Sequence, residues 1–122
     1  MSKGSSYRRE LQELVGKAHD RELEVYLDEL EMRFKEWREG RISPSDLSDF
    51  IHEFHDISAR HVYKTYTTLK REELVARAIG IGLLREEEIP SEIREKLSAA
   101  IDYYDQYYEI DDDDPLSRLR GQ

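Results

Sequence analysis

The sequence contains no cysteine and no asparagine. Without cysteine, a disulfide framework, a thiolate metal site and a cysteine nucleophile are all excluded. No apolar run approaches the roughly 20 residues that a membrane-spanning helix needs, and residues 1–6 lack the apolar stretch of a secretory signal. We therefore expect a soluble, cytoplasmic protein without a membrane partner.

A basic patch is also missing. The 122 residues carry a formal net charge of −9, and residues 102–114 contain seven acids and no base. Nucleic-acid binding normally requires clustered Lys and Arg, so we expect no direct contact with nucleic acid. The acidic balance leaves open a protein that mimics nucleic acid with its own negative charge.

Strand signals are absent as well. No long stretch alternates apolar and polar residues, and neither Asn-Gly nor Asp-Gly occurs. The remaining pattern has helical period and predicts an all-α fold, a small antiparallel helical bundle of about four helices with a long first helix. The expected helices cover residues 7–39, 44–67, 70–81 and 91–108.

The same pattern divides the chain into three parts. Residues 1–6 are expected to form a disordered N-terminus and residues 7–110 a single helical domain. Residues 111–122 are expected to form an acidic disordered tail, because a run of like charges followed by Pro115 does not support a core.

The first predicted helix carries two apolar stripes of different phase. In its first half the stripe is Tyr7, Leu11, Leu14 and Ala18, and in its second half it is Leu23, Leu27, Leu30, Phe34 and Trp37. Because the second stripe does not continue the first, either the buried face rotates or the helix breaks near residues 19–22. We expect one continuous helix, since no strong stop signal precedes Gly40.

The second predicted helix opens with a strong start signal, in which Ser43 is the cap and Pro44 takes the first helical position. At about 100° per residue, its core face holds Leu47, Phe50, Ile51, Phe54, Ile57, His61 and Val62. We therefore expect His61 to be buried and hydrogen-bonded across the bundle.

Three of the four histidines lie in one ten-residue stretch of this helix. His52 can share an ion with His55, Asp56 or Asp49, which lie three or four residues away on the helix, and further ligands would come from another helix. This cluster is a candidate site for a divalent metal ion, and a metal-dependent hydrolase would use it. The simpler interpretation is a solvated polar face.

The doublets His19-Asp20 and His55-Asp56 resemble the His…His-Asp…Asp ligand pattern of the HD-type metal phosphohydrolases. The resemblance covers only these positions. It implies a metal site made of His19, His55, Asp56 and either Asp102 or Asp105.

Four tyrosines close the fourth predicted helix. Tyr104 and Tyr108 continue its buried stripe, whereas Tyr103 and Tyr107 lie on a neighbouring face. Because tyrosine is enriched at protein interfaces, Tyr103 and Tyr107 are the candidate interface residues.

Other catalytic motifs are missing, since no phosphate-binding loop and no nucleophile elbow occurs. We therefore assign no catalytic residue and no cofactor. We expect a non-enzymatic protein–protein interaction, adaptor or regulatory module, whose partner is another protein or a second copy of the chain in a dimer. The alternatives are a metal-binding helical protein or metal-dependent hydrolase, and an acidic nucleic-acid mimic.

Overall fold

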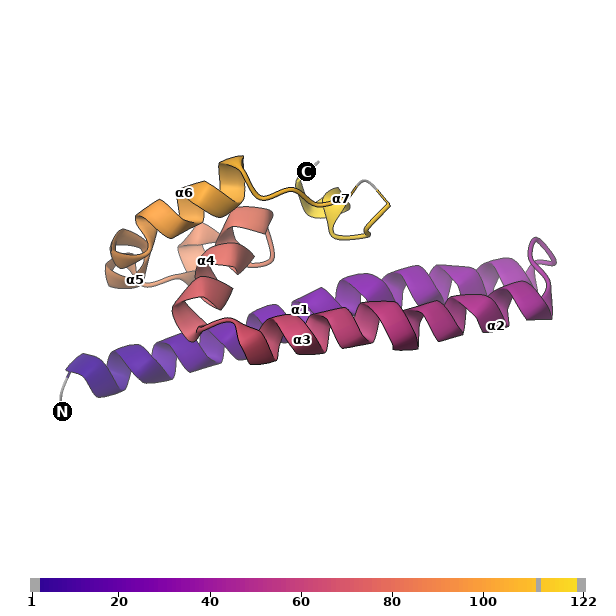
Figure 1. Cartoon of the computed structure of the whole chain (residues 1–122), viewed down its shortest axis with the longest axis horizontal. Coiled ribbons are helices and arrows are strands. Elements are labelled where there is room, and N and C mark those ends of the chain that lie inside the picture. The colour runs from indigo at the N-terminus through magenta and orange to yellow at the C-terminus, as the bar shows by residue number, and fades with distance from the viewer. Residues whose placement is uncertain (1–2, 112, 121–122) are drawn as a thin grey trace.

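The computed structural model describes residues 3–111 and 113–120, and every regular element in this part of the chain is a helix (Figure 1). The all-α prediction and the long first helix are confirmed. Two long helical rods lie side by side as a hairpin, and the shorter helices pack on the half of this hairpin that holds the N-terminus. The described helices include none that is long and apolar enough to cross a membrane.

The first rod is the single helix α1 (Lys3–Arg38). It passes through His19-Asp20 without a break, as expected, and Gly40 follows it with a positive φ of 78°. The helix begins four residues before the expected start, within the segment that we expected to be disordered. Residues 1–2 lie outside the described residues.

The second rod consists of α2 (Pro44–Glu53), a π-helical segment η1 (Phe54–Ala59) and α3 (Arg60–Thr68). Its start is the expected one. The Asp46 backbone N–H donates to the Ser43 hydroxyl and the Ser43 backbone N–H donates to the Asp46 carboxylate, each at 3.0 Å. This reciprocal capping box satisfies two N–H groups that a helix start otherwise leaves unpaired.

The centre of the domain is α4 (Arg71–Ile81), whose residues from Leu74 to Ile81 are all buried. It packs against α1 on one side and α6 (Ser98–Gln106) on the other. Gly80 lies inside this helix. A Cβ at Gly80 would lie 2.5 Å from the Cβ of Tyr104, so the glycine permits the close approach of α6, and Gly82 (φ 95°) ends the helix.

The expected fourth helix is two helices, α5 (Ser91–Lys96) and α6, separated at Leu97, whose ψ of 8° leaves the helical range. The expected linker before it includes a 3₁₀ turn, η2 (Glu86–Glu88), and contributes Leu83, Leu84 and Ile89 to the core. The bundle of about four antiparallel helices therefore stays a prediction.

The buried stripe of α1 does not rotate. It runs straight from Leu11, Leu14 and Ala18 through Glu22 and Tyr26, all of which are buried. The pattern of apolar residues does not reveal this continuity, because the core position that follows Ala18 is the carboxylate residue Glu22. The second apolar stripe lies beside the core, and its members Leu27 and Phe34 are 49% and 41% exposed.

The predicted core face of the second rod is correct in part. Leu47 and Val62 are buried as predicted, whereas Ile51, Ile57 and His61 are exposed, and the unpredicted Tyr66 is half-buried. A π-helical turn holds one residue more than an α-helical turn, so it rotates the following residues by roughly 100° relative to an unbroken α-helix. The rotation moves His61 away from the core.

The C-terminal segment, residues 113–120, folds back toward the hairpin and ends in α7 (Ser117–Arg120). We expected this segment to be part of a disordered tail, but Leu116 is 2% exposed and belongs to the main apolar core. Residues 112 and 121–122 of that expected tail lie outside the described residues.

Candidate functional site

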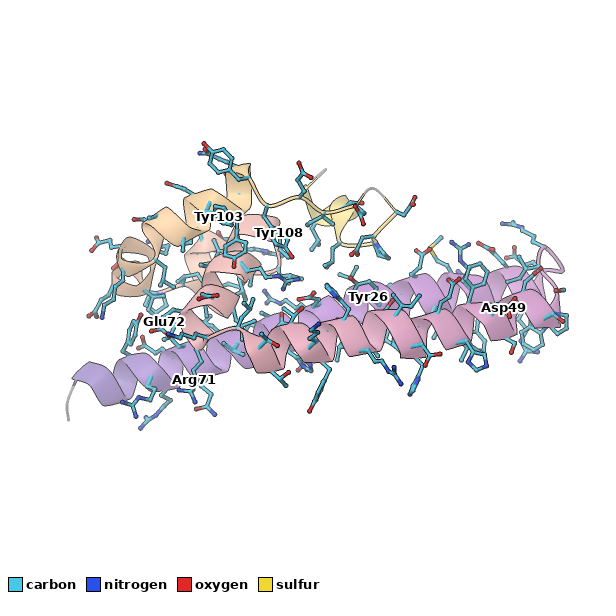
Figure 2. All side chains as sticks on the ribbon, in the orientation of Figure 1. Tyr26, Asp49, Arg71, Glu72, Tyr103 and Tyr108 are labelled. Carbon is cyan, nitrogen blue, oxygen red and sulfur yellow. The ribbon has the colours of Figure 1, made fainter. Side chains whose placement is uncertain are left out.

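A groove runs between the hairpin and the C-terminal segment. Two adjacent cavities of about 290 and 460 Å³ form it, and Tyr26, Ser58, Asp113 and Pro115 line both. Figure 2 shows Tyr26 on α1 and Tyr108 just after α6, on the two sides of this space. A concave site of this size is the default place to look for a binding function.

Arg77, which lines the larger of the two cavities, takes part in a buried ion pair. Arg77 of α4 donates from Nη1 and Nη2 to the two carboxylate oxygens of Glu22 at 2.7 and 2.8 Å, and the two residues are 1% and 0% exposed. The hydroxyl of Tyr66 donates to the same carboxylate at 2.7 Å. The network thus joins both rods of the hairpin to α4.

The electrostatics of this network keep Arg77 charged. Burial alone lowers the pKa of Arg77, but the hydrogen bonds and negative charge of Glu22 outweigh burial and raise it above its ordinary value. Burial, together with the charge of Glu22, raises the pKa of Tyr66. Because the opposite charges of Glu22 and Arg77 neutralise each other, the ion pair contributes shape and rigidity to the groove and little net charge.

The C-terminal segment is held as one wall of the groove by Asp114. Its carboxylate accepts a hydrogen bond of 2.8 Å from the Tyr26 hydroxyl and one of 2.9 Å from the Leu116 backbone N–H. Burial and this bond to Asp114 raise the pKa of Tyr26. Tyr26 therefore acts as a hydrogen-bonding donor that fastens the segment to α1.

The rest of the lining combines apolar surface with carboxylates. The apolar groups are contributed by Leu30, Phe50, Phe54, Ile57, Tyr108, Ile110 and Pro115. The remaining carboxylates are Glu29, Glu53, Glu109, Asp111 and Asp113. Carboxylates next to aromatic faces are the surroundings that favour a guanidinium or ammonium group.

Arg33 shows how this lining holds a cation. Its guanidinium lies 4.8 Å from the centroid of the Phe50 ring. It also donates to Glu29 and Glu36, in each case at 2.6 Å. The chain thus fills one end of its own groove with an arginine held by an aromatic ring and carboxylates.

The π-helical segment η1 contributes to the same wall, because Phe54, Ile57 and Ser58 all line the groove. π-Helical turns occur frequently at functional sites, where they change the direction of side chains. In this chain the turn leaves Ile57 exposed beside the groove.

The metal candidates lie on the outer surface of the second rod. His52, His55, Asp56 and Asp49 are all exposed, and Figure 2 shows Asp49 on the outer half of the hairpin. His55 Nδ1 lies 3.1 Å from Asp56, and this hydrogen bond lowers the pKa of the Asp56 carboxyl. Within residues 3–111 and 113–120, no three His, Asp or Glu side chains are grouped as a metal site requires.

The ligand set implied by the HD-type resemblance is also dispersed. The His19 ring packs edge-on against Tyr66 with centroids 4.9 Å apart. His55 lies eleven residues before Tyr66 on the same rod, which corresponds to roughly 16 Å at the helical rise. The metal hypothesis therefore rests on the sequence pattern alone.

The interface candidates are exposed, Tyr103 by 54% and Tyr107 by 70%, with ring centroids 6.2 Å apart. Tyr104 and Tyr108 are half-buried and pack against the core, as their place on the helix predicts. Tyr108 also lines the groove, whereas Tyr103 and Tyr107 do not.

The network residues Glu22, Tyr66 and Arg77 and the groove residue Tyr26 were not predicted from the sequence. One signal was available, because Glu22 and Tyr26 follow Ala18 at four-residue steps on the stripe of Leu11 and Leu14. Comparisons with protein-family models, curated proteins and solved structures find no match to this chain. Its function must therefore be argued from this site.

Proposed function

We propose that the protein is a cytoplasmic protein–protein interaction module that binds a basic segment of a partner protein in the groove. The observation that carries the proposal is the lining of the groove, which combines aromatic and aliphatic side chains with carboxylates beside Arg77 of the buried ion pair. An extended peptide with arginine or lysine beside an aliphatic residue has the complementary chemistry.

The arrangement of charge supports a peptide over a single small cation. The carboxylates Glu53, Glu109, Asp111 and Asp113 are all exposed and are contributed by both sides of the groove. Distributed rim charges chiefly increase the association rate and set the register of a partner, while the apolar groups between them supply affinity.

The first experiment selects phage-displayed random 12-residue peptides on the full chain. We expect the enriched peptides to carry several Arg or Lys residues and at least one aliphatic residue. Enrichment of neutral or acidic peptides would contradict the proposal, as would a failure to enrich any peptide over repeated rounds.

The second experiment measures the best peptide by fluorescence polarisation on two charge-matched variants. The double variant Glu109→Gln/Asp113→Asn removes two groove carboxylates, and Glu86→Gln/Glu87→Gln removes two exposed carboxylates elsewhere. We expect the groove variant to weaken binding by about tenfold, equivalent to about 1.4 kcal/mol, and the control to change it less than twofold. Equal weakening by both variants would reveal general attraction to a negative protein and reject the groove.

Self-association is a second candidate function, favoured by apolar side chains on the outer half of the hairpin. Leu27, Phe34 and Ile51 are 49%, 41% and 41% exposed. If a second copy covered them, two hairpins would form the bundle of four antiparallel helices that the sequence predicts, in a twofold-symmetric dimer. We expect native mass spectrometry to find a dimer that Leu27→Glu/Phe34→Glu dissociates.

The matched control for the dimer is Met32→Glu. Met32 is 46% exposed but lies roughly on the opposite side of α1 from Leu27 and Phe34, at about 3.6 residues per turn. This variant is expected to stay dimeric. A monomeric wild-type chain at micromolar concentration removes the second candidate and leaves the groove proposal intact.

A further inference from the structure

A further cavity lies between α3 and the end of α6 and shares His61, Arg77 and Tyr108 with the larger cavity of the groove. It has a volume of about 350 Å³ and is lined by His61, Lys64, Thr65, Thr68, Leu69, Arg77, Tyr104 and Tyr108. The contrast with the neighbouring groove is chemical. Its lining combines basic side chains and hydroxyl groups and contains no carboxylate.

Arg77 gives this cavity a specific hydrogen-bonding need. Its Nη1 and Nη2 atoms donate to Glu22, and its Nε–H is buried without an acceptor among the residues that the structure describes. A buried donor without a partner costs free energy, and in native proteins it calls for an acceptor from outside the chain. The guanidinium that borders the cavity therefore has one N–H group left for a bound molecule.

The neighbouring groups specify the kind of acceptor. Because Glu22 neutralises the charge of Arg77, the positive charge for a ligand is that of Lys64, an exposed residue of α3. Thr65 already donates its hydroxyl hydrogen to the His61 carbonyl at 2.9 Å, so this hydroxyl has no hydrogen left to donate to a ligand. Lysine and arginine on two sides of a cavity favour an oxyanion with several acceptor oxygens.

We propose that this cavity binds the phosphate group of a small phosphate monoester. Lys64 supplies the charge, the Arg77 Nε–H supplies the directed hydrogen bond, and Leu69 with the Tyr104 ring receives the apolar part of the ester. The volume suits a ligand of this size. The site shares Arg77, His61 and Tyr108 with the lining of the acidic groove, but its proposed ligand does not depend on the peptide function proposed above.

The experiment titrates full-length ¹⁵N-labelled protein with inorganic phosphate and with phenyl phosphate, followed by ¹H–¹⁵N NMR. The Arg77 Nε–H signal is the direct reporter, since a new charged acceptor moves it downfield. We expect a saturable shift with both probes and binding of phenyl phosphate at least threefold tighter than that of inorganic phosphate. Equal affinities for phenyl phosphate and inorganic phosphate would contradict the proposed ester ligand and indicate a site for an inorganic anion only.

Matched lysine variants test the position of the site. Lys64→Met removes the cavity charge, and Lys35→Met removes an equally exposed charge at the end of α1, outside the cavity. We expect Lys64→Met to weaken phenyl phosphate binding at least fivefold and Lys35→Met to leave it within twofold. The site is refuted if the Nε–H signal does not move, if equal concentrations of sodium chloride move it as far, or if the two variants behave alike.

Discussion

The buried Glu22–Arg77 pair allows a strong test of the protein interior. Removing one partner alone should destabilise the fold strongly, whereas replacing the whole network with apolar groups should not. Replacing Glu22 with leucine leaves the Arg77 charge and the Tyr66 hydroxyl buried without their acceptor. Breaking a buried pair in this way costs about 3–5 kcal/mol, and an orphaned hydroxyl adds about 1–3 kcal/mol. We therefore expect Glu22→Leu to lower the free energy of unfolding by about 4–8 kcal/mol.

That loss is a large part of the total. A chain of 122 residues has an expected unfolding free energy of about 6–18 kcal/mol. The triple variant Glu22→Leu/Tyr66→Phe/Arg77→Met replaces the whole network with apolar groups of similar size. It is expected to fall within about 1.5 kcal/mol of wild type, because apolar replacement of a complete buried pair is often neutral or stabilising.

The assay is urea unfolding followed by circular dichroism at 222 nm, with unchanged dependence on urea as the check that the same surface unfolds. If Glu22→Leu does not fold, Glu22→Gln keeps the shape and is expected to cost about 1.5–3 kcal/mol, the range for hydrogen bonds to a charged group. The reasoning fails if Glu22→Leu costs less than about 1.5 kcal/mol or if the triple variant is no more stable than Glu22→Leu.

Three further predictions concern other parts of the fold. Gly80→Ala should destabilise the protein by about 1–3 kcal/mol in urea unfolding because the added methyl group collides with α6. At Gly16 an added methyl group meets nothing within 4 Å, so Gly16→Ala should stabilise the protein by about 0.5–1 kcal/mol. The opposite order of stabilities would contradict the packing of α4. Hydrogen bonding to Arg21 lowers the pKa of Glu88 to about 2. The stabilising effect of Glu88 is therefore complete above its ordinary pKa of 4.5 and is lost as the pH falls toward 2. In carboxyl NMR titration, Arg21→Met should return the pKa of Glu88 toward its ordinary value, and an unchanged pKa would show that the contact is absent. Ser43→Ala should cost about 0.5–2 kcal/mol by thermal or urea unfolding, and no loss would mean that the capping box does not form in solution.

Much of the secondary structure follows from local signals in the sequence. Ser43 and Pro44 predict the start of the second rod because capping depends only on adjacent residues. Gly40 and Gly82 end their helices for the same local reason, since both have positive φ. The exposed positions of Tyr103 and Tyr107 also follow from helical period alone.

The groove could not be predicted in this way. The π-helical turn at residues 54–59 rotates everything that follows it, and no residue in that segment signals an extra residue in the turn. Glu22 and Arg77 are polar, so a hydrophobic pattern places each of them outside the core. Only a partner from another helix makes their burial favourable, and helix period contains no information about that partner.

The sequence by itself determined the helical class, the length of α1 and the capped start of α2, because these depend on composition and on contacts within a few residues. The tertiary structure alone decided that Glu22 is a core residue, that His61 is not, and that Asp114 and Leu116 hold the acidic C-terminal segment against the hairpin. The physical reason is that a buried charge or a folded acidic run is stable only when a distant residue supplies the matching charge, hydrogen bond or apolar surface.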